Sequence, residues 1–312
     1  MVTRTSTGEH VALTESVASG SQSRINSATA ATLAPIVVAG MHRSGTSLAA
    51  ALLQNAGVDI GPRLLAGNWS NPRGHFEDVD FIELQRSIFV AAGRHPDGWV
   101  TSPLPDIPAS FVEQARLLLE ERQRHQRAWG WKDPRSVPLL GLWSSLAPEA
   151  AFAIVYRPPW EVLESLFLRG DHAFVEDPEL AIRVWTYYNS VLLDLARARP
   201  ARCVVANMEM IAAQPVAWSR AVAACASVTL SDPDTGICEP HFLHGKSSVT
   251  RASIIRRHYP EAIDLYDRLE ALTFAPELVA SRSAPAEDPD AERHQAMRDW
   301  QRVCAHRRIA TA

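Results

Sequence analysis

Residues 40–47 (GMHRSGTS) join a strand pattern to a helix pattern, and this junction is the strongest indication of the fold. Residues 34–40 (APIVVAG) form a short apolar run that is typical of a buried strand. Over residues 46–56, leucine and alanine recur on one helical face. Gly40 and Gly45 are spaced as in a P-loop, whose backbone N–H groups surround a phosphate at the N-terminus of the following helix. The stretch therefore predicts a strand, a phosphate-binding turn and a helix.

The cation of this turn is not where a nucleoside-triphosphate P-loop has it. Such a loop needs Lys directly after its second glycine, and here Thr46 occupies that position. The basic residue is Arg43, inside the turn, and the second apolar strand pattern ends in Tyr156 and Arg157 rather than in a magnesium-binding Asp. These residues favour metal-free binding of a phosphate by arginine, and we expect no metal site. A P-loop small-molecule kinase or nucleotide hydrolase stays open as an alternative.

Strand and helix patterns alternate outward from this turn. Apolar runs predict two further strands, at 151–156 and 202–206. Helical periodicity predicts helices over 80–92, 110–126, 158–169 and 178–199. We expect Asp80 and Ser110 to begin capping boxes and Asp177 to cap the longest helix. Strands separated by helices imply an α/β fold, a three-layer sandwich with a central, mostly parallel sheet and a P-loop-like nucleotide site.

A second motif follows the second apolar strand. Arg157 stands at the carboxyl end of that strand, where ligands gather in open α/β sheets. Ser165 comes eight residues later, about two turns into the next predicted helix. A guanidinium and a hydroxyl in this arrangement can together bind one more phosphate.

These two motifs together resemble those of the sulfotransferases that use 3′-phosphoadenosine-5′-phosphosulfate (PAPS). The resemblance runs over roughly residues 36–224, and the arginine in the turn is similar to the bacterial carbohydrate and tyrosyl-protein branches. It implies that the 3′-phosphate is bound by Arg157 and Ser165. It implies that the 5′ end is bound by the turn, through Arg43, Ser44, Gly45, Thr46 and Ser47.

The resemblance also implies a catalytic lysine. In the segment WGWKDPR (129–135), Lys132 lies 25 residues before Arg157, where the cytosolic branch has a lysine near the sulfonate. Lys132, with Arg43, would then neutralise charge on the bridging oxygen as the product PAP leaves. The catalytic histidine of that branch is absent, because Pro134 occupies its place.

A carboxylate is therefore the candidate general base. Some branches use a Glu after the first helix, and the segment NPRGHFED (71–78) offers Glu77. A glutamate with a pKa of about 4.3 is a weak base unless its surroundings raise that pKa, so we expect Glu77 to be enclosed. His75 and Asp133 are the alternatives. Family members often cover the nucleotide with a late basic loop, which implies a contribution from Lys246 and Arg251, although a plain solvated loop is the alternative there.

Composition sets the outer limits. With 31 basic and 35 acidic residues the net charge is −4, so we expect no nucleic-acid binding. The four cysteines are widely spaced, which predicts neither disulfides nor a zinc site and favours a cytoplasmic protein. No apolar run approaches the roughly 20 residues of a membrane span. The 29 Arg against two Lys are typical of a GC-rich bacterial genome.

We expect one catalytic domain between two tails. Residues 1–33 are rich in Ser, Thr and Ala and predict a disordered tail, residues 34–280 the sulfotransferase domain, and residues 281–312 a linker with a basic helix. The predicted reaction moves a sulfuryl group from PAPS to an acceptor hydroxyl, with a glycan or a secondary metabolite favoured as acceptor. A catalytically inactive PAP(S)-binding protein is a further alternative, and the sequence leaves the oligomeric state open.

Overall fold

The computed structural model describes residues 33–67, 74–124, 127–238 and 249–274, together with His294 and Met297. All of these residues belong to one compact unit that begins at Thr32. Lys246 and nearly all of the two predicted tails lie outside the described residues, so the predicted domain boundaries stay predictions.

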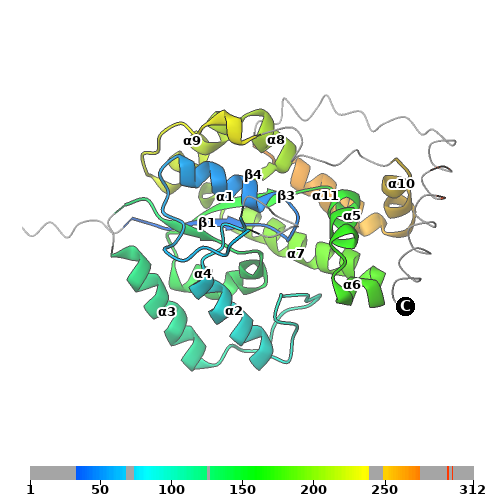
Figure 1. Cartoon of the computed structure of the whole chain (residues 1–312), viewed down its shortest axis with the longest axis horizontal. Helices are drawn as coiled ribbons and strands as arrows, with labels where there is room; N and C mark the ends of the chain where they lie inside the picture. The colour runs from blue at the N-terminus through cyan, green and yellow to red at the C-terminus, as the bar shows by residue number, and fades with distance from the viewer. Residues whose placement is uncertain are drawn as a thin grey trace, which may run out of the picture. The chain divides into compact units, whose positions relative to one another are not determined.

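Four parallel strands form the central sheet (Figure 1), in the order β2–β1–β3–β4. They are β1 (Ile36–Ala39), β2 (Gly130–Lys132), β3 (Ala151–Tyr156) and β4 (Cys203–Asn207). The predicted parallel sheet is therefore confirmed, with β1, β3 and β4 close to their predicted bounds. Periodicity did not predict β2, because three residues are too few to show it. The register pairs Val38 with Lys132, which places the end of β2 beside the end of β1.

Helices connect these strands. They are α1 (Thr46–Asn55), α2 (Val79–Ala91), α3 (Ala109–Gln123), α4 (Leu140–Leu146), α5 (Pro159–Arg169), α6 (His172–Glu176), α7 (Pro178–Ala198), α8 (Met208–Ala213), α9 (Pro215–Ala226), α10 (Val249–His258) and α11 (Pro260–Glu270). A 3₁₀ helix, η1 (Pro134–Leu139), follows β2 directly. The helices predicted over 46–56, 80–92, 110–126, 158–169 and 178–199 correspond to α1, α2, α3, α5 and α7.

Two of the predicted helix caps are wrong. The side chain of Asp78, not Asp80, caps α2 by accepting a hydrogen bond from the Asp80 N–H. The Asp80 carboxylate is instead paired with arginines. Helix α3 begins after Pro108 without a side-chain cap. The predicted cap on α7 is confirmed, because Asp177 accepts from the Leu180 N–H.

The sheet separates two hydrophobic cores, as alternation along each strand requires. Val37 and Ala39 of β1 face one core, while Ile36 and Val38 face the other. Helices α1, α8 and α9 cover the second core, and the remaining helices cover the first. Figure 1 shows α1, α8 and α9 on one side of the sheet, with α2, α3, α4 and α7 on the other. The predicted three-layer sandwich is thereby confirmed, and the carboxyl ends of its strands meet at one edge.

Candidate active site

The turn between β1 and α1 is shaped by two glycines. A Cβ on Gly40 would collide with the carbonyl oxygen of Val155 in β3 and lie 2.6 Å from Thr46 Cγ2. Gly45, with φ +93°, is the residue before the first helical turn, and a Cβ there would collide with Met208. Only glycine fits both positions, because the chain must leave β1 against its neighbour and then reverse in a left-handed conformation.

This turn offers donors to an anion. The first N–H groups of α1 have no partner within the helix and point to the site with the positive end of the helix dipole. The side chain of Ser44 is 0% exposed, and its hydroxyl has no hydrogen-bond partner among the described residues. An orphaned hydroxyl beside a helix N-terminus suits a phosphate or phosphosulfate oxygen.

The two segments predicted to bind phosphates lie in contact. Arg43 Nε donates to Ser165 Oγ at 2.7 Å across 122 residues of sequence. Arg157 Nη1 donates to the carbonyl oxygen of Arg43 at 3.4 Å. Arg157 Nε also donates to Glu161 Oε2, in the first turn of α5, at 2.7 Å. Arg43, predicted at the 5′ end, thus reaches the predicted 3′ side and lies between the two motifs.

A third arginine, for which the sequence predicted no role, joins this cluster. Arg169 follows Ser165 by one helical turn and pairs with Asp171, with 2.7 Å between Nε and Oδ2. Burial, with the positive charges of Arg169 and Arg157, lowers the pKa of Arg43 to about 10. Three crowded guanidinium groups favour a bound anion, which would relieve their repulsion. The spacing of Ser165 and Arg169 by four residues, on one face of a predicted helix, was the available signal.

Lys132 links this turn to the candidate base. Its Nζ donates to Glu77 Oε1 at 2.6 Å, to the His75 carbonyl oxygen at 2.9 Å and to Ser47 Oγ at 3.3 Å. The side chain is held at the end of β2 and the residue is only 2% exposed. Three segments far apart in sequence, from β2, from α1 and from residues 75–77, therefore meet at one ammonium group.

Glu77 is enclosed as expected, but its surroundings shift its pKa in the other direction. The residue is 4% exposed, and Arg135 Nη2 donates to its Oε2 at 2.6 Å. Burial by itself raises the pKa of Glu77, but the charges of Lys132 and Arg135 outweigh it and the net pKa is lowered. Glu77 is therefore ionised at neutral pH, and the expectation that enclosure strengthens it as a base is wrong for the ligand-free protein. Arg135, which ends the WGWKDPR segment, had no role predicted from sequence.

The two alternative bases differ in access. His75 is half-buried, and burial lowers the pKa of its ring. The negative charge of Glu77 raises this pKa, while the positive charges of Lys132, Arg169 and Arg43 lower it further. Asp133 is 0% exposed. Burial and the negative charge of Glu77 raise the pKa of Asp133 to about 6, although the positive charge of Arg135 lowers it. Asp133 thus lies behind Glu77, out of reach of solvent.

His42 lies at the edge of the site, although no role was assigned to it from sequence. Its Nε2 donates to the Asp97 carbonyl oxygen at 3.2 Å, and its ring centroid is 4.5 Å from that of Trp99. Burial and the charges of Arg169, Arg135 and Lys132 lower its pKa well below the usual value. The imidazole is therefore neutral, and its loop is tied to residues 93–98.

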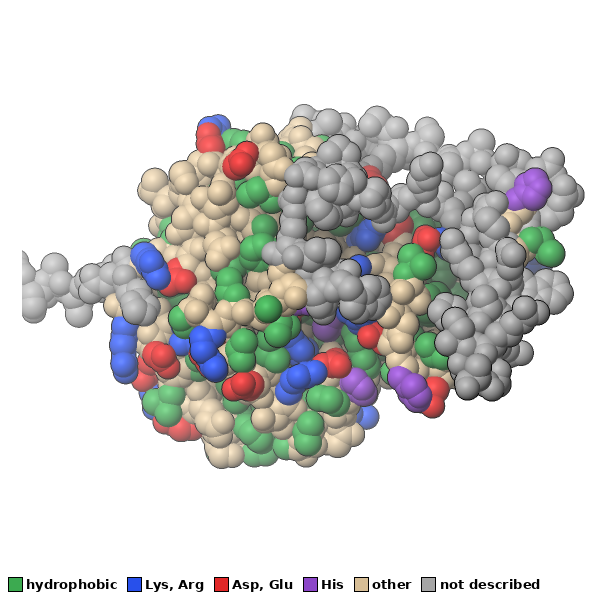
Figure 2. Space-filling model, viewed as in Figure 1, with side chains coloured by type: hydrophobic (Ala, Val, Ile, Leu, Met, Phe, Trp, Pro, Cys, Tyr) green, Lys and Arg blue, Asp and Glu red, His purple; other side chains and the backbone are tan. Residues whose placement is uncertain are grey.

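Arg251 lies on α10 and forms an ion pair with Glu164 of α5, the residue before Ser165. This contact brings one residue of the predicted late basic segment to the predicted 3′ side. Basic and acidic side chains lie interspersed over the face shown in Figure 2.

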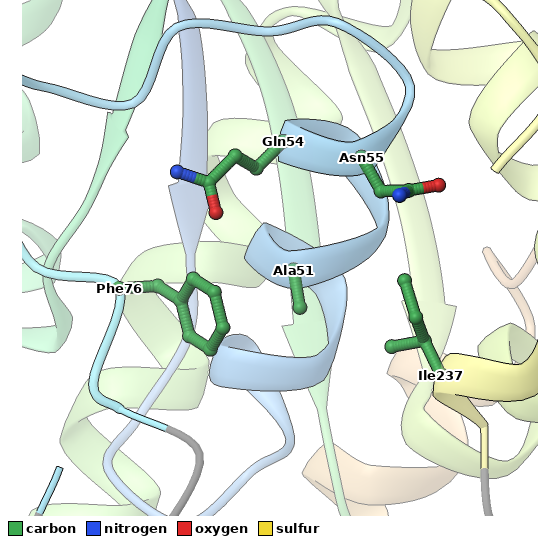
Figure 3. Close-up of a pocket in the computed structure, with 5 residues that line it drawn as sticks. All are labelled: Ala51, Gln54, Asn55, Phe76 and Ile237. Carbon is green, nitrogen blue, oxygen red and sulfur yellow. The ribbon is translucent and has the colours of Figure 1, made fainter. Parts of the chain in front are cut away.

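A surface groove of about 520 Å³ lies elsewhere (Figure 3), lined by Ala51, Gln54, Asn55, Phe76 and Ile237. None of the candidate catalytic or phosphate-binding residues lines it. Within the described ranges, no group of three His, Cys, Asp or Glu side chains is placed to hold a metal ion. In the same part of the chain, no helix has the length and apolar character needed to cross a bilayer.

Comparison with known proteins gave matches among solved structures only. No family model and no curated protein matches the chain. The sulfotransferase domain of the Synechococcus olefin synthase is 20% identical, covering 82% of this chain and 91% of its own, with a TM-score of 0.41. A sulfotransferase from Mycobacterium avium is 16% identical; the match covers 76% of this chain and 77% of that one, with a TM-score of 0.47. The sulfotransferase domain of the curacin biosynthetic pathway is 17% identical; the match covers 69% of this chain and 79% of that one, with a TM-score of 0.43.

These similarities to sulfotransferases lie below 25% identity and below a TM-score of 0.5. They carry no argument about activity, and we infer the function from the site itself.

Proposed function

We propose that the chain is a sulfotransferase, which moves a sulfuryl group from PAPS to an acceptor hydroxyl and yields PAP and a sulfate ester. The observation that carries the proposal is the position of Lys132. Its ammonium group reaches both Ser47, in the anion-binding turn, and Glu77, the candidate base. A cation between an anion site and a carboxylate matches a reaction in which negative charge develops on one side while a proton leaves on the other.

The residues present fit the donor. The orphaned Ser44 hydroxyl, Gly45, Thr46, Ser47 and the first N–H groups of α1 would hold the 5′-phosphosulfate. Arg157 and Ser165 would hold the 3′-phosphate, with Arg43 between the two ends. Arg251, and Lys246 outside the described residues, would add positive charge on the 3′ side.

When bound, PAPS supplies an electrophilic sulfuryl group and PAP as its leaving group. Glu77 would take the proton of the acceptor hydroxyl as its oxygen receives the sulfuryl group. Lys132 would stabilise the negative charge left on the departing phosphate oxygen of PAP, and Arg43 would share that role. Electrostatic contributions of this kind are large because the site is buried.

We favour a glycan or a secondary metabolite as acceptor from the resemblance to bacterial sulfotransferases. Cys203, Cys225 and Cys238 are free thiols, which supports a cytoplasmic location. An inactive PAP(S)-binding protein would keep the donor site and lack turnover.

A calorimetric titration of PAP against ADP, without and with magnesium, tests the proposal. Charge-assisted hydrogen bonds are worth about 1.5–3 kcal/mol each, so the 3′-phosphate contacts should make PAP bind at least about tenfold tighter. Magnesium should leave this ratio unchanged. Equal affinities, or a magnesium-dependent preference for ADP, would favour the kinase alternative instead.

Variants of two helical serines test where the preference for PAP over ADP arises. Ser165→Ala should remove most of the preference for PAP. Ser190→Ala is the matched control, because its hydroxyl bonds only a backbone carbonyl within α7 in the described structure. A preference that survives Ser165→Ala would move the 3′-phosphate elsewhere.

A further inference from the structure

Behind the candidate base, one guanidinium group serves two carboxylates. Arg135 Nη2 donates to Glu77 Oε2 at 2.6 Å. Its Nε donates to both oxygens of Asp133, at 2.8 and 3.1 Å. All three side chains are at least nine-tenths buried, so water screens their charges weakly. The charge state of one carboxylate therefore affects the other through Arg135.

The geometry of Asp133 is fixed on every side. Gln85 Nε2 of α2 donates to Asp133 Oδ2 at 2.8 Å, and the Trp143 indole holds Gln85 in turn at 3.1 Å. The backbone N–H of Arg135 donates to Asp133 Oδ1 at 2.9 Å. Asp133 is 0% exposed, so it cannot touch an acceptor. Its contacts restrict it to acting through Arg135.

The charges around this pair come from several elements. Asp133 is acted on by Arg135 from its own segment, Glu77 from the segment before α2 and Tyr188 from α7. Asp97, from the loop before α3, pairs with Arg135. Glu77 by itself faces two cations, Lys132 and Arg135. If Asp133 were neutral, the whole charge of Arg135 would act on Glu77 and weaken it as a proton acceptor.

We propose that Asp133 is a positioning residue for Glu77: it holds Arg135 and takes up part of its charge, which leaves Glu77 able to accept the proton of the acceptor. This inference rests on the proposed function, in which Glu77 is the base. Because burial brings the pKa of Asp133 to about 6, the support is present at neutral pH and lost in mild acid.

The charge sharing is measurable without turnover. Coupling between two sites is reciprocal, so removing the charge of Glu77 must change the titration of Asp133. We would follow the Asp133 side-chain carboxyl carbon by NMR in the full chain. In Glu77→Gln its midpoint should fall by about one pH unit or more, since a like charge is lost and Arg135 is freed.

The control is Glu83→Gln, which alters an exposed glutamate of α2 and should leave the Asp133 midpoint unchanged. An equal midpoint in the wild type and Glu77→Gln would overturn the proposal.

Turnover gives a second, separate readout. At pH 7–8, kcat of Asp133→Asn should be roughly three- to tenfold below the wild type, because general-base catalysis follows base strength. Below about pH 5.5 the two should converge, since Asp133 is then protonated in the wild type as well. A loss of equal size at every pH would mean a merely structural role and contradict the proposal.

Gln85→Met covers the case in which Asp133→Asn does not fold. It keeps both carboxylates and removes the Gln85 donor to Asp133, together with the acceptor of the Trp143 indole N–H, so the acid-side fall in kcat should move to higher pH. An unmoved fall would count against Asp133. A wild type that binds no PAP and transfers no sulfuryl group would refute the proposed function, while the NMR titration would still decide the charge sharing.

Discussion

A substitution of Glu77 should separate catalysis from donor binding. Glu77→Gln keeps the size of the side chain and removes its capacity to take a proton. We expect kcat to fall by about 10²–10⁴-fold while PAP affinity is retained, because Glu77 contacts Lys132 and Arg135 but none of the residues proposed to hold the phosphates. Single-turnover assays and calorimetry on the same preparation check both halves.

Turnover at the wild-type rate in Glu77→Gln would rule out Glu77 as the base and favour His75, one of the alternative bases. Intact PAP binding without turnover in the wild type would instead support the inactive binding protein.

Asp133 should leave a signature in stability as well. Its folded pKa, about 6, lies above the value of 3.8 expected when unfolded. Between these values the folded state binds more protons, so stability falls as pH rises, by up to about 1.4 kcal/mol per pH unit from this group. Glu77 has a lowered pKa and contributes the opposite trend only at lower pH, where its stabilisation is lost as pH falls.

Urea denaturation of the wild type and Asp133→Asn between pH 4.5 and 6 tests this sign. We expect the wild type to lose stability relative to the variant as pH rises through that window. Parallel pH profiles of stability would show that folding does not raise the pKa of Asp133.

At the scale of elements, the close approach of β1, its turn and β3 is the feature most sensitive to substitution. Gly40→Ala places a methyl group against the Val155 carbonyl and Thr46. We expect a loss of about 1–3 kcal/mol in stability and weaker PAP binding, since the turn must shift to relieve the collision.

Gly141→Ala is the matched control. Gly141 lies in α4, and a Cβ there would have no atom within 4 Å. This variant should be neutral or stabilise by about 0.4–1 kcal/mol, because alanine favours the helix. Equal effects of the two substitutions in thermal unfolding would contradict the steric account of Gly40.

Helix α11 ties the carboxyl ends of two strands together. Glu270 Oε1 accepts from the Tyr156 hydroxyl at 2.8 Å and from Asn207 Nδ2 at 3.0 Å. Tyr156 directly precedes Arg157. Helix α11 therefore helps to fix the end of β3, which is followed directly by Arg157, a residue proposed to bind the 3′-phosphate.

For the whole molecule, donor binding should appear as stability. A ligand at 100 times its Kd stabilises the folded state by about 2.7 kcal/mol. For a protein of this size that is a rise of roughly 5–10 °C in Tm, at about 2–4 °C per kcal/mol. PAP should give this rise without magnesium. Arg157→Ala should lose most of it, and an undiminished rise in that variant would place the PAP site elsewhere.

Much of this architecture could be predicted from sequence because its signals are local. The apolar runs of β1, β3 and β4 and the glycine turn at residues 40–45 are each readable within a short window. Helix caps were less predictable: Asp78 and Asp80 both suit an N-cap, and only the ion pairs of Asp80 with Arg63 and Arg122 decide between them. Strand β2 was too short for its period to show.

Local sequence signals were enough to predict that a glycine turn follows a buried strand, that an arginine and a serine follow a second strand, and that strands and helices alternate. These follow from backbone conformation and hydrophobic period, which neighbouring residues set. Folding brings Arg43 to Ser165, places Arg169 near them, and sets Glu77 between Lys132 and Arg135. Proton affinity depends on burial and on charges from distant segments, so the lowered pKa of Glu77 and the raised pKa of Asp133 exist only once the chain has folded.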